Sequence, residues 1–580
     1  MGEYNLKKLI SCSLIILFLL SSCDHINRAR FSSGGEISIH DIQGCNHISP
    51  WNGNLVNGIE GVVTWKLENG FFMQELYPDN EDCSSEGIFI FTNEYPSVIP
   101  GDMVIVDGRV HEFTAGSSDE GNLSITEIEA DNVQVIGINY EVPSAELIGL
   151  LGRLPPDKTI EDDKMTSFDA VNDGIDFFES LEGMRVQISE AVVVESTNKF
   201  NEVFVIPADL VNENTLSLTG ALIQTESDSN PERLLIQMPD GYNKYVYMGD
   251  VLSTQIIGVM SYDYGNYRIV TINNPTFEAV NGLQNFQSPE IEDTEIRLVT
   301  YNINNFNRFN EDRVNSIAAQ VVFDLGLPDI LVLQEIQDDS GLDDDGTTSA
   351  AQNLESLINE ILDLGGVQYR YLEQKPVNNT SGGASGANIR TAILFREDRG
   401  LTLGNNQCDL SFPDSAAFSN SRKPIVCEFS RNGNSLFVIG VHFVSNNLNT
   451  PLFGAFQPIQ KPEESKRISQ AKAIADLVEK INSAYPSSSI VIAGDFNDVP
   501  WSNTMEQLEN KNFTNTSFAI EEMDRYSIIY EGNASIFDQI LVSKELVNRL
   551  SSIQVIHLNT TEPDNKQISD HDPVLVDFQF

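Results

Sequence analysis

The stretch "VIAGDFNDVP", from Val491 to Pro500, raises the main question about the C-terminal half of the chain: whether a buried strand ends in a turn or in a functional site. Residues 490–493 are all apolar and predict a buried strand that ends at a glycine. Asp495 and Asn497 follow two positions apart, so their side chains lie on one side of an extended segment while Phe496 points the other way. Gly, Asp and Asn also form ordinary turns, so the stretch alone is compatible with a turn or with a functional site.

Apolar strands alternate with helices from residue 296 to residue 580. "IRLVTYNI" and "PDILVLQEI" are typical of strands, and residues 311–325 between them carry apolar side chains at helical spacing. A helix over residues 463–481 precedes the quoted strand, and "FDQILVS" and "PVLVDF" follow it as further strands. This alternation predicts an α/β sandwich.

Six strands of this region each bring polar side chains to one end. The side chains belong to Asn302, Glu335, His442, Asp495 with Asn497, Asp538, and Asp570 with His571. Taken alone, each has an ordinary explanation, because a glutamate after a strand is usually solvated and a histidine on an apolar strand is usually a satisfied core group. Six such strand ends in a region with three histidines predict one shared site.

The residue types suit hydrolysis of a phosphodiester. This reaction needs a divalent cation to polarise a non-bridging oxygen, and Mg²⁺ prefers carboxylate and amide oxygens as ligands. Glu335 and Asn302 fit that role. A histidine that is held by an aspartate can move a proton or stabilise charge, and His571 with Asp538 is the natural pair.

The order and wording of six motifs resemble the endonuclease/exonuclease/phosphatase superfamily. The motifs are "TYNINNFN", "LQEI", "GVHF", "GDFND", "FDQILV" and "SDHDPV", and the resemblance covers residues 297–580. It implies a four-layer α/β sandwich, with two sheets face to face and helices outside. It also implies a metal-dependent phosphodiesterase that uses Mg²⁺, with Mn²⁺ or Ca²⁺ as alternatives.

The resemblance assigns roles to the residues motif by motif. It places Asn302, Glu335 and Asp570 at the metal, His442 at the phosphate, Asp495 and Asn497 at the attacking water, and Asp538 behind His571. The sequence leaves open whether Asp495 or His571 is the general base.

Further wording is similar to a secreted bacterial nuclease branch that carries upstream OB-like domains. "GGASGANIRTAILFRED" and "SRKPIVCEF" carry this resemblance, and they make Arg390 and Arg422 candidate contacts to substrate phosphate. Salt pairing within an acidic protein is the alternative for both arginines. Val444 stands where those nucleases often have a lysine, so a basic contact to nucleic acid is missing.

Two mainly β, OB-like domains are predicted upstream of the sandwich. Residues 36–138 read as short strands divided by Gly, Pro, Asn and Asp, and residues 142–280 repeat this pattern loosely before a polar linker at 281–295. Three aromatic residues of the first domain are candidates for stacking on nucleic-acid bases, with a place in the core as the alternative; they are Phe71, Phe72 and Phe89.

Residues 1–23 read as a targeting segment. Two lysines precede a short apolar run, and "LSSC" at its end resembles the lipobox of bacterial lipoproteins, with Cys23 as the lipidated residue. A plain secretory signal is the alternative. Either reading predicts an extracytoplasmic protein, anchored to a membrane in the first case.

Four further cysteines form two local pairs. No CxxC motif or nearby histidine cluster accompanies them, so disulfides are favoured over a metal site. We expect Cys45 to pair with Cys83 and Cys408 to pair with Cys427.

The strong negative charge limits the possible functions. Eighty-five Asp and Glu residues against 35 Lys and Arg residues give a formal net charge of −50, which argues against a protein that coats nucleic acid. The main hypothesis is a lipid-anchored extracytoplasmic nuclease that cleaves DNA, or also RNA, with no protein partner predicted. The alternatives are a phosphatase or phospholipid phosphodiesterase of the same superfamily, and a non-catalytic surface binding protein.

Overall fold

The computed structural model describes most of the chain after the first 36 residues. The described ranges are 37–79, 81–117, 120–212, 215–280, 287–404, 416–486 and 488–580. The predicted signal segment with Cys23, the first part of the predicted linker and Cys408 lie outside them. The lipid anchor and the pairing of Cys408 with Cys427 therefore stay predictions.

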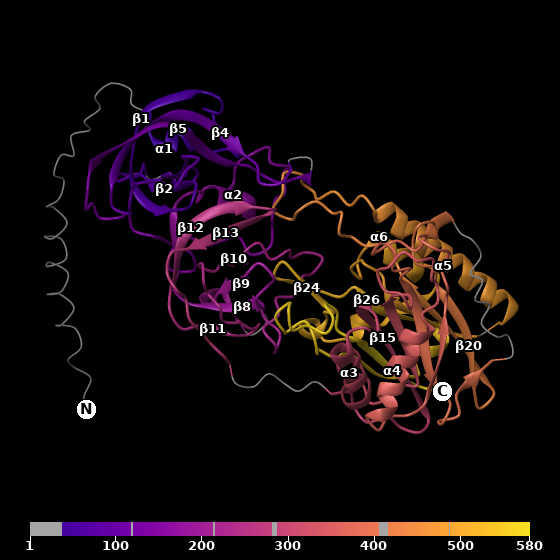
Figure 1. Cartoon of the computed structure of the whole chain (residues 1–580). Helices are drawn as coiled ribbons and strands as arrows, with labels where there is room; N and C mark the ends of the chain where they lie inside the picture. The colour runs from indigo at the N-terminus through magenta and orange to yellow at the C-terminus, as the bar shows by residue number, and fades with distance from the viewer. Residues whose placement is uncertain are drawn as a thin grey trace, which may run out of the picture.

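The first region is a closed five-stranded barrel, drawn in indigo in Figure 1. Its strands neighbour one another in the order β1-β2-β3-β5-β4, with β3 parallel to β5 and the other pairs antiparallel. Their bounds are Leu55–Lys66, Gly70–Gln74, Gly87–Phe91, Met103–Phe113 and Ile125–Gly137 for β1 to β5, after a short helix α1 at Ile39–Gln43. The mainly β character of this domain is confirmed, and its OB-like identity stays a prediction.

The aromatic residues of the barrel are packed inside the protein. Phe71 is fully buried in the barrel core. Phe72 and Phe89 contact each other, with ring centroids 4.9 Å apart, and pack against Val259 of the next domain. The prediction that they are a stacking platform for bases is therefore wrong, and the alternative, a place in the core, is confirmed.

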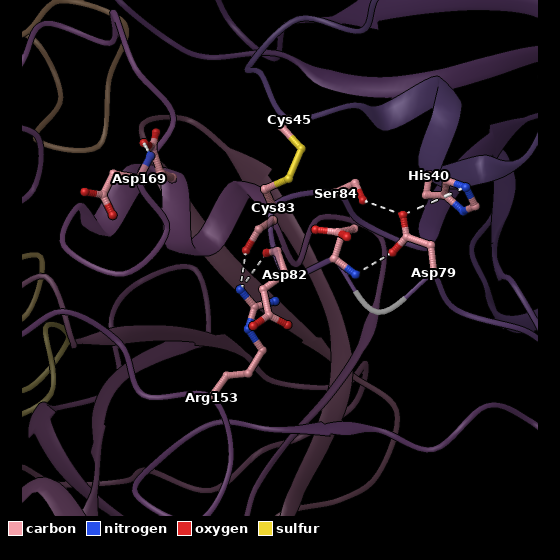
Figure 2. The surroundings of a disulfide bond; sticks show 11 residues. His40, Cys45, Asp79, Asp82, Cys83, Ser84, Arg153 and Asp169 are labelled. Carbon is pink, nitrogen blue, oxygen red and sulfur yellow. Dashed lines mark hydrogen bonds and ion pairs between the residues drawn. A yellow bond between two sulfur atoms is a disulfide. The ribbon is translucent and has the colours of Figure 1, made fainter.

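A disulfide between Cys45 and Cys83 closes a loop beside the barrel, as predicted (Figure 2). Next to it, Arg153 of the second domain donates hydrogen bonds to the carbonyl of Asp82 at 3.1 Å and to Ser180 Oγ at 2.7 Å. The disulfide loop is thus fastened to the second domain as well as to the barrel.

The second region is one nine-stranded mixed sheet and not a second closed barrel. The strand order is β14-β11-β8-β9-β10-β13-β12-β7-β6. The elements are β6 Glu146–Leu147, α2 Gly174–Glu179, β7 Arg185–Ile188, β8 Ala191–Glu195, β9 Glu202–Pro207, β10 Leu234–Gln237, β11 Val251–Leu252, β12 Ile256–Asp263, β13 Asn266–Thr271 and β14 Phe277–Glu278. The prediction of a mainly β domain is confirmed here too.

The C-terminal region contains two six-stranded sheets. The first has the order β17-β18-β16-β15-β28-β27 and the second the order β19-β20-β21-β22-β26-β23. The bounds in the first sheet are β15 Glu295–Phe306, β16 Ile330–Ile336, β17 Tyr369–Glu373, β18 Arg390–Arg396, β27 Leu550–Val555 and β28 Val574–Gln579. Those in the second are β19 Thr402–Leu403, β20 Ile425–Arg431, β21 Asn434–His442, β22 Ser489–Asp495, β23 Phe513–Asn515 and β26 Asp538–Ser543.

Four layers follow from how these sheets and the helices share three cores. Side chains of both sheets meet in one core, the first sheet packs on helices α3 and α4, and the second packs on α5 and α6. The helices are α3 Glu311–Ala319, α4 Ala351–Asp363, α5 Glu464–Ala484, α6 Asn503–Glu509 and the short α7 Lys544–Val547. The predicted α/β sandwich is confirmed.

The position of strand β22 between two cores explains why its sequence is apolar up to the glycine. Val491 and Ala493 enter the core between the sheets, whereas Ile490 and Ile492 enter the core under α5. Both faces are buried, so neither face needs polar residues.

Among the described residues, none of the helices has the length and the apolar composition that a membrane crossing requires.

The second β domain packs against the sandwich beside the ends of these strands. The hairpin of β24, Ile528–Tyr530, and β25, Asn533–Ser535, exchanges backbone hydrogen bonds with it, from Gln224 N to the carbonyl of Ala534 and from Ala534 N to the carbonyl of Leu222, both 2.9 Å. Phe453, from the segment between β21 and α5, is buried in the core of the second domain. Figure 1 shows β24 lying between the two regions.

Candidate active site

The strand register brings the predicted residues together. In the second sheet, β21 places His442 opposite Asp495, and β26 places Asp538 opposite Asp495 on the other side. In the first sheet, regular pairing of β15 with β16 is interrupted after Asn302, close to Glu335. Because the two sheets lie face to face, these positions converge at one edge of the sandwich.

Contacts between the sheets join four of the predicted residues. Asn302 Nδ2 donates hydrogen bonds to Asp495 Oδ2 at 3.1 Å and to Glu335 Oε1 at 3.3 Å. His442 Nε2 lies 3.4 Å from Asp495 Oδ2 and 3.9 Å from Glu335 Oε1. The structure therefore gathers Asn302, Glu335, His442 and Asp495 into one cluster.

Two site residues have left-handed backbone conformations, with φ of +63° at Glu335 and +52° at Asn497. Such conformations are uncommon for residues other than glycine and persist where surrounding contacts hold them. Asn305 N donates to Glu335 Oε2 at 2.9 Å, and Asn497 donates to Asp495 from its backbone N at 2.7 Å and from Nδ2 at 3.0 Å. These bonds fix the directions of both carboxylates.

The turn after β22 separates the functional side chains from the structural ones. Phe496 points into the core and contacts Phe443, with ring centroids 5.2 Å apart. Asp498 accepts hydrogen bonds from Arg467 Nε at 3.1 Å and Thr504 Oγ1 at 2.7 Å. It therefore holds the turn, while Asp495 and Asn497 line the site.

His571 and Asp538 form the predicted pair. His571 Nδ1 lies 2.6 Å from Asp538 Oδ2, which also accepts a hydrogen bond from Ser527 Oγ at 2.8 Å. Burial by itself lowers the pKa of His571, but Asp538, Asp570 and Asp495 outweigh it and raise the pKa well above its usual value. These surroundings therefore favour the charged form of His571.

Two other pKa values complete the electrostatics of the cluster. Burial, with the nearby charges of Asp538 and Glu335, raises the pKa of Asp495 to about 7, although His571 opposes this shift. Burial, together with Arg422 and His571, lowers the pKa of His442 well below its usual value. The surroundings therefore favour the neutral form of His442 and the charged form of His571, and they leave Asp495 as a carboxyl group that can gain or lose a proton near pH 7.

The predicted metal ligands form a donor set of oxygens only. Glu335 and Asp570 offer carboxylates and Asn302 an amide, and the two acids line the same cavity. Glu335 is half-buried and Asp570 exposed, so water can complete the coordination of a cation. This donor set fits a hard cation such as Mg²⁺, which keeps several waters when bound.

The two predicted phosphate-binding arginines differ. Arg422 is buried at the cavity, donates from Nη2 to the carbonyl of Phe443 at 2.6 Å, and its Nε has no hydrogen-bond partner among the described residues. Arg390 instead pairs with Glu373 at 2.7 Å and donates to the carbonyl of Asn388 at 2.8 Å. The structure does not bring Arg390 to the cluster, and its alternative role in salt pairing is confirmed.

The cluster opens into a cavity of about 550 Å³ whose wall is completed by the second β domain. The predicted residues at this cavity are Glu335, Arg422, His442, Asp495, Asn497, Asp570 and His571. Gln224, Arg233 and Tyr264 reach it from the second domain. Sequence reasoning missed these three residues because they lie in another domain and belong to no motif.

Two family models match the chain, one over most of the C-terminal sandwich and one over the second β domain with part of the barrel. Residues 299–571 match the model of the Endonuclease/Exonuclease/phosphatase family. Residues 108–281 match a domain of unknown function, DUF8508, which begins within β4 of the barrel and spans the second β domain. No curated protein matches the chain.

Solved structures are similar to about half of the chain. TDP2 from D. rerio, solved with a single-strand DNA product, is 15% identical, with a TM-score of 0.35, and the match covers 50% of this chain and 100% of that one. An endonuclease/exonuclease/phosphatase from Bacteroides vulgatus is 15% identical, with a TM-score of 0.32, over 50% and 99% of the two chains. A family protein from Leptotrichia buccalis is also 15% identical, with a TM-score of 0.35, over 49% and 100%.

Proposed function

We propose, from the premise that residues 299–571 are an endonuclease/exonuclease/phosphatase family domain, that the protein is a divalent-metal-dependent nuclease acting on DNA or RNA. The observation that carries this proposal is the cluster of Asn302, Glu335, His442 and Asp495 beside the pair of His571 and Asp538. A lapsed catalytic domain would be expected to have lost at least one of these groups.

Asp495 is the group best suited to orient and deprotonate the attacking water. Its carboxylate is buried, faces the cavity and is aimed by two hydrogen bonds from Asn497. A general base works best when its pKa lies near the working pH, and burial raises the pKa of Asp495 to about 7. We therefore propose Asp495 for the role of general base, which the sequence left open between Asp495 and His571.

His571, Arg422 and neutral His442 are the groups that would contact the phosphoryl oxygens. Asp538 favours the charged form of His571, and Arg422, which lines the cavity, has an Nε without a hydrogen-bond partner among the described residues. Donors fixed in advance in a water-poor site stabilise charge that develops in the transition state. A cation bound by Asn302, Glu335 and Asp570 would polarise the scissile phosphate and neutralise part of its charge.

A second candidate function is favoured by the apolar part of the cavity wall. Ile389, Leu452, Ile459 and Phe537 line it, and the net charge of −50 repels long polyanions. A phospholipid phosphodiesterase or a phosphatase would use the same phosphate-binding groups with a different leaving group.

One assay separates these functions. The protein without residues 1–23 is incubated with plasmid DNA, RNA, bis-nitrophenyl phosphate and sphingomyelin, each with Mg²⁺, Mn²⁺, Ca²⁺ or EDTA. Cleavage of DNA or RNA that needs a metal and is lost in Asp495→Asn supports the nuclease. Hydrolysis of sphingomyelin alone supports the lipid phosphodiesterase, and intact DNA and RNA with every metal contradict the main proposal.

The location outside the cytoplasm is part of the proposal. The Cys45–Cys83 disulfide supports it, because such bonds persist in oxidising compartments. Anchoring is tested by feeding labelled palmitate to cells that express the full chain, with Cys23→Ser as the control. Equal labelling of both proteins, or of neither, argues against Cys23 as the anchor.

A further inference from the structure

A second acidic cluster lies in the second β domain, outside the catalytic cavity. It consists of Glu161, Asp173 and Asp176, which each offer a carboxylate oxygen within 4.8 Å of the others. Asp173 directly precedes helix α2 and is 2% exposed, Asp176 in that helix is fully buried, and Glu161 is half-buried. Three acids in so small and so dry a space are costly unless something compensates their charge.

The hydrogen bonds within the protein leave part of this cluster unsatisfied. Asp176 is satisfied, because His47 Nε2 lies 2.7 Å from its Oδ1 and the backbone N of Asp169 donates to its Oδ2. Asp173 Oδ1 and Glu161 Oε2, in contrast, are buried and have no hydrogen-bond partner among the described residues. Buried polar atoms without partners are rare in proteins, and each calls for an explanation such as an ion.

We propose that this cluster is a calcium site, with Glu161 and Asp173 as its main ligands and Asp176 as the third. All three residues present hard oxygens, which Ca²⁺ prefers, and Ca²⁺ takes ligands at about 2.3–2.6 Å in flexible geometry. Oxygens on opposite sides of one Ca²⁺ are therefore up to about 5 Å apart, a range that includes the spacing of this cluster.

The charges around the cluster are consistent with a missing cation. Burial, and after it the charges of the neighbouring Glu161 and Asp162, together raise the pKa of Asp173 to about 7. His47 supplies one positive charge, since its hydrogen bond to Asp176 and the nearby charge of Glu179, 3.7 Å from Nδ1, outweigh burial and raise its pKa to about 10. This charge faces Asp176, so the carboxylate pair of Glu161 and Asp173 is left without a counter-charge of its own.

The position of the site gives the ion a structural role. Gly174, next to Asp173, packs so closely on Pro231 and Phe453 that a Cβ atom there would lie 2.6 Å and 3.4 Å from them. Phe453 belongs to the sandwich, and Tyr262 of the second domain donates a hydrogen bond to its carbonyl at 2.9 Å. Bound Ca²⁺ would hold α2 against this contact and so stabilise the joint between the two domains.

The test uses the full chain with Glu335→Gln, which removes a carboxylate of the catalytic cluster and leaves the proposed calcium site intact. Calcium chloride is titrated into this protein by calorimetry, and its unfolding temperature is measured with and without Ca²⁺. We expect binding and a rise in unfolding temperature. Adding Asp173→Asn is expected to raise the unfolding temperature without Ca²⁺, because it removes an uncompensated charge, and to weaken Ca²⁺ binding about tenfold or more.

Two further variants complete the test. Asp162→Asn is the matched control, because Asp162 is an exposed acid next to a proposed ligand and should leave Ca²⁺ binding within about twofold. Glu161→Gln, at a half-buried ligand, replaces Asp173→Asn if that variant does not fold. The proposal is overturned if the Glu335→Gln protein does not bind Ca²⁺, or if Asp173→Asn or Glu161→Gln keeps the full rise in unfolding temperature.

Discussion

Two of the histidine–aspartate pairs in the C-terminal sandwich, His571 with Asp538 and His557 with Asp572, have different surroundings. His571 Nδ1 lies 2.6 Å from Asp538 Oδ2 at the wall of the catalytic cavity. His557 Nδ1 lies 3.1 Å from Asp572 Oδ2, and the imidazole stacks on Tyr526 with ring centroids 3.9 Å apart. All four residues are buried, and of the four only His571 lines the cavity.

The two aspartates are also used differently. Asp572 accepts hydrogen bonds from Leu558 N at 2.9 Å, Asn559 N at 2.7 Å and Thr560 Oγ1 at 2.5 Å, so its charge holds the loop after β27. Asp538 binds Ser527 and His571 and has an Oδ1 without a partner among the described residues. Whether a buried histidine–aspartate pair can serve the proposed chemistry therefore depends on what its imidazole faces.

Replacing His571 and His557 by alanine, one at a time, should give the largest difference in activity between the two pairs. His571→Ala is expected to lower kcat for the cleaved phosphodiester about 10³-fold, because the site loses a fixed cation beside the phosphate. His557→Ala should leave kcat of the folded enzyme within about threefold and lower the unfolding temperature, because it removes buried stacking on Tyr526. Steady-state kinetics and thermal unfolding of both variants measure this. Equal losses of kcat would contradict the assignment of the two pairs.

Removing the charge of Asp572 should lower the stability of the protein and leave its activity nearly unchanged. Asp572→Asn replaces an acceptor of several buried donors by a group that is itself partly a donor, and we expect it to lower the free energy of unfolding by about 2–4 kcal/mol. Urea unfolding gives this value, and kcat at a temperature where the variant is folded should be close to that of the wild type. A fall in kcat of more than about tenfold without a loss of stability would place Asp572 in the chemistry.

The residues at the site edge of the sandwich could be predicted from the sequence, because each follows or precedes an apolar run that is recognisable as a buried strand. The apolar run before Asp495 requires burial on both faces, and the register of β21, β22 and β26 then brings His442 and Asp538 beside it. The distinction between His571 and Asp572 was less visible. They are neighbours in "SDHDP" and point to opposite sides, one to the cavity and one to the loop after β27.

Features that depend on partners distant in the sequence could not be predicted. Arg390 and Arg422 look equivalent in the sequence, and only the position of Glu373 across β17 and β18 commits the first to an ion pair. The nine-stranded sheet gave the same short-strand pattern as a barrel, because closure depends on which edge strands meet. The cavity wall from the second domain depends on the packing between domains, which no local pattern encodes.

The stability of the protein should depend on pH through the charge of His571. The net effect of Asp538, Asp570 and Asp495 is a pKa of His571 well above its value of about 6.5 in an unfolded chain. In EDTA, the stabilisation from protonated His571 should be fully present below about pH 6.5 and should be lost as the pH rises through the folded-state pKa. The difference in unfolding free energy between wild type and His571→Gln should therefore shrink with rising pH, by at most about 1.4 kcal/mol per pH unit. A difference that is constant from pH 5 to 9 would show that His571 is not held as a cation.

Replacing Arg233 at the cavity should have the smallest of these effects, a change in substrate binding. Arg233 of the second domain is buried at the cavity wall, donates from Nη1 to the carbonyl of Asn230 at 2.7 Å, and has an Nη2 without a partner among the described residues. Arg233→Gln should therefore raise KM about fivefold with kcat nearly unchanged, because a guanidinium there attracts the substrate anion without touching the reacting bond. Arg390→Gln is the matched control: it breaks the buried pair with Glu373 and should lower the unfolding temperature while KM stays the same. If both variants changed KM equally, or neither did, the position of Arg233 at the cavity would not matter for substrate binding. The second domain would then support the site without being part of it.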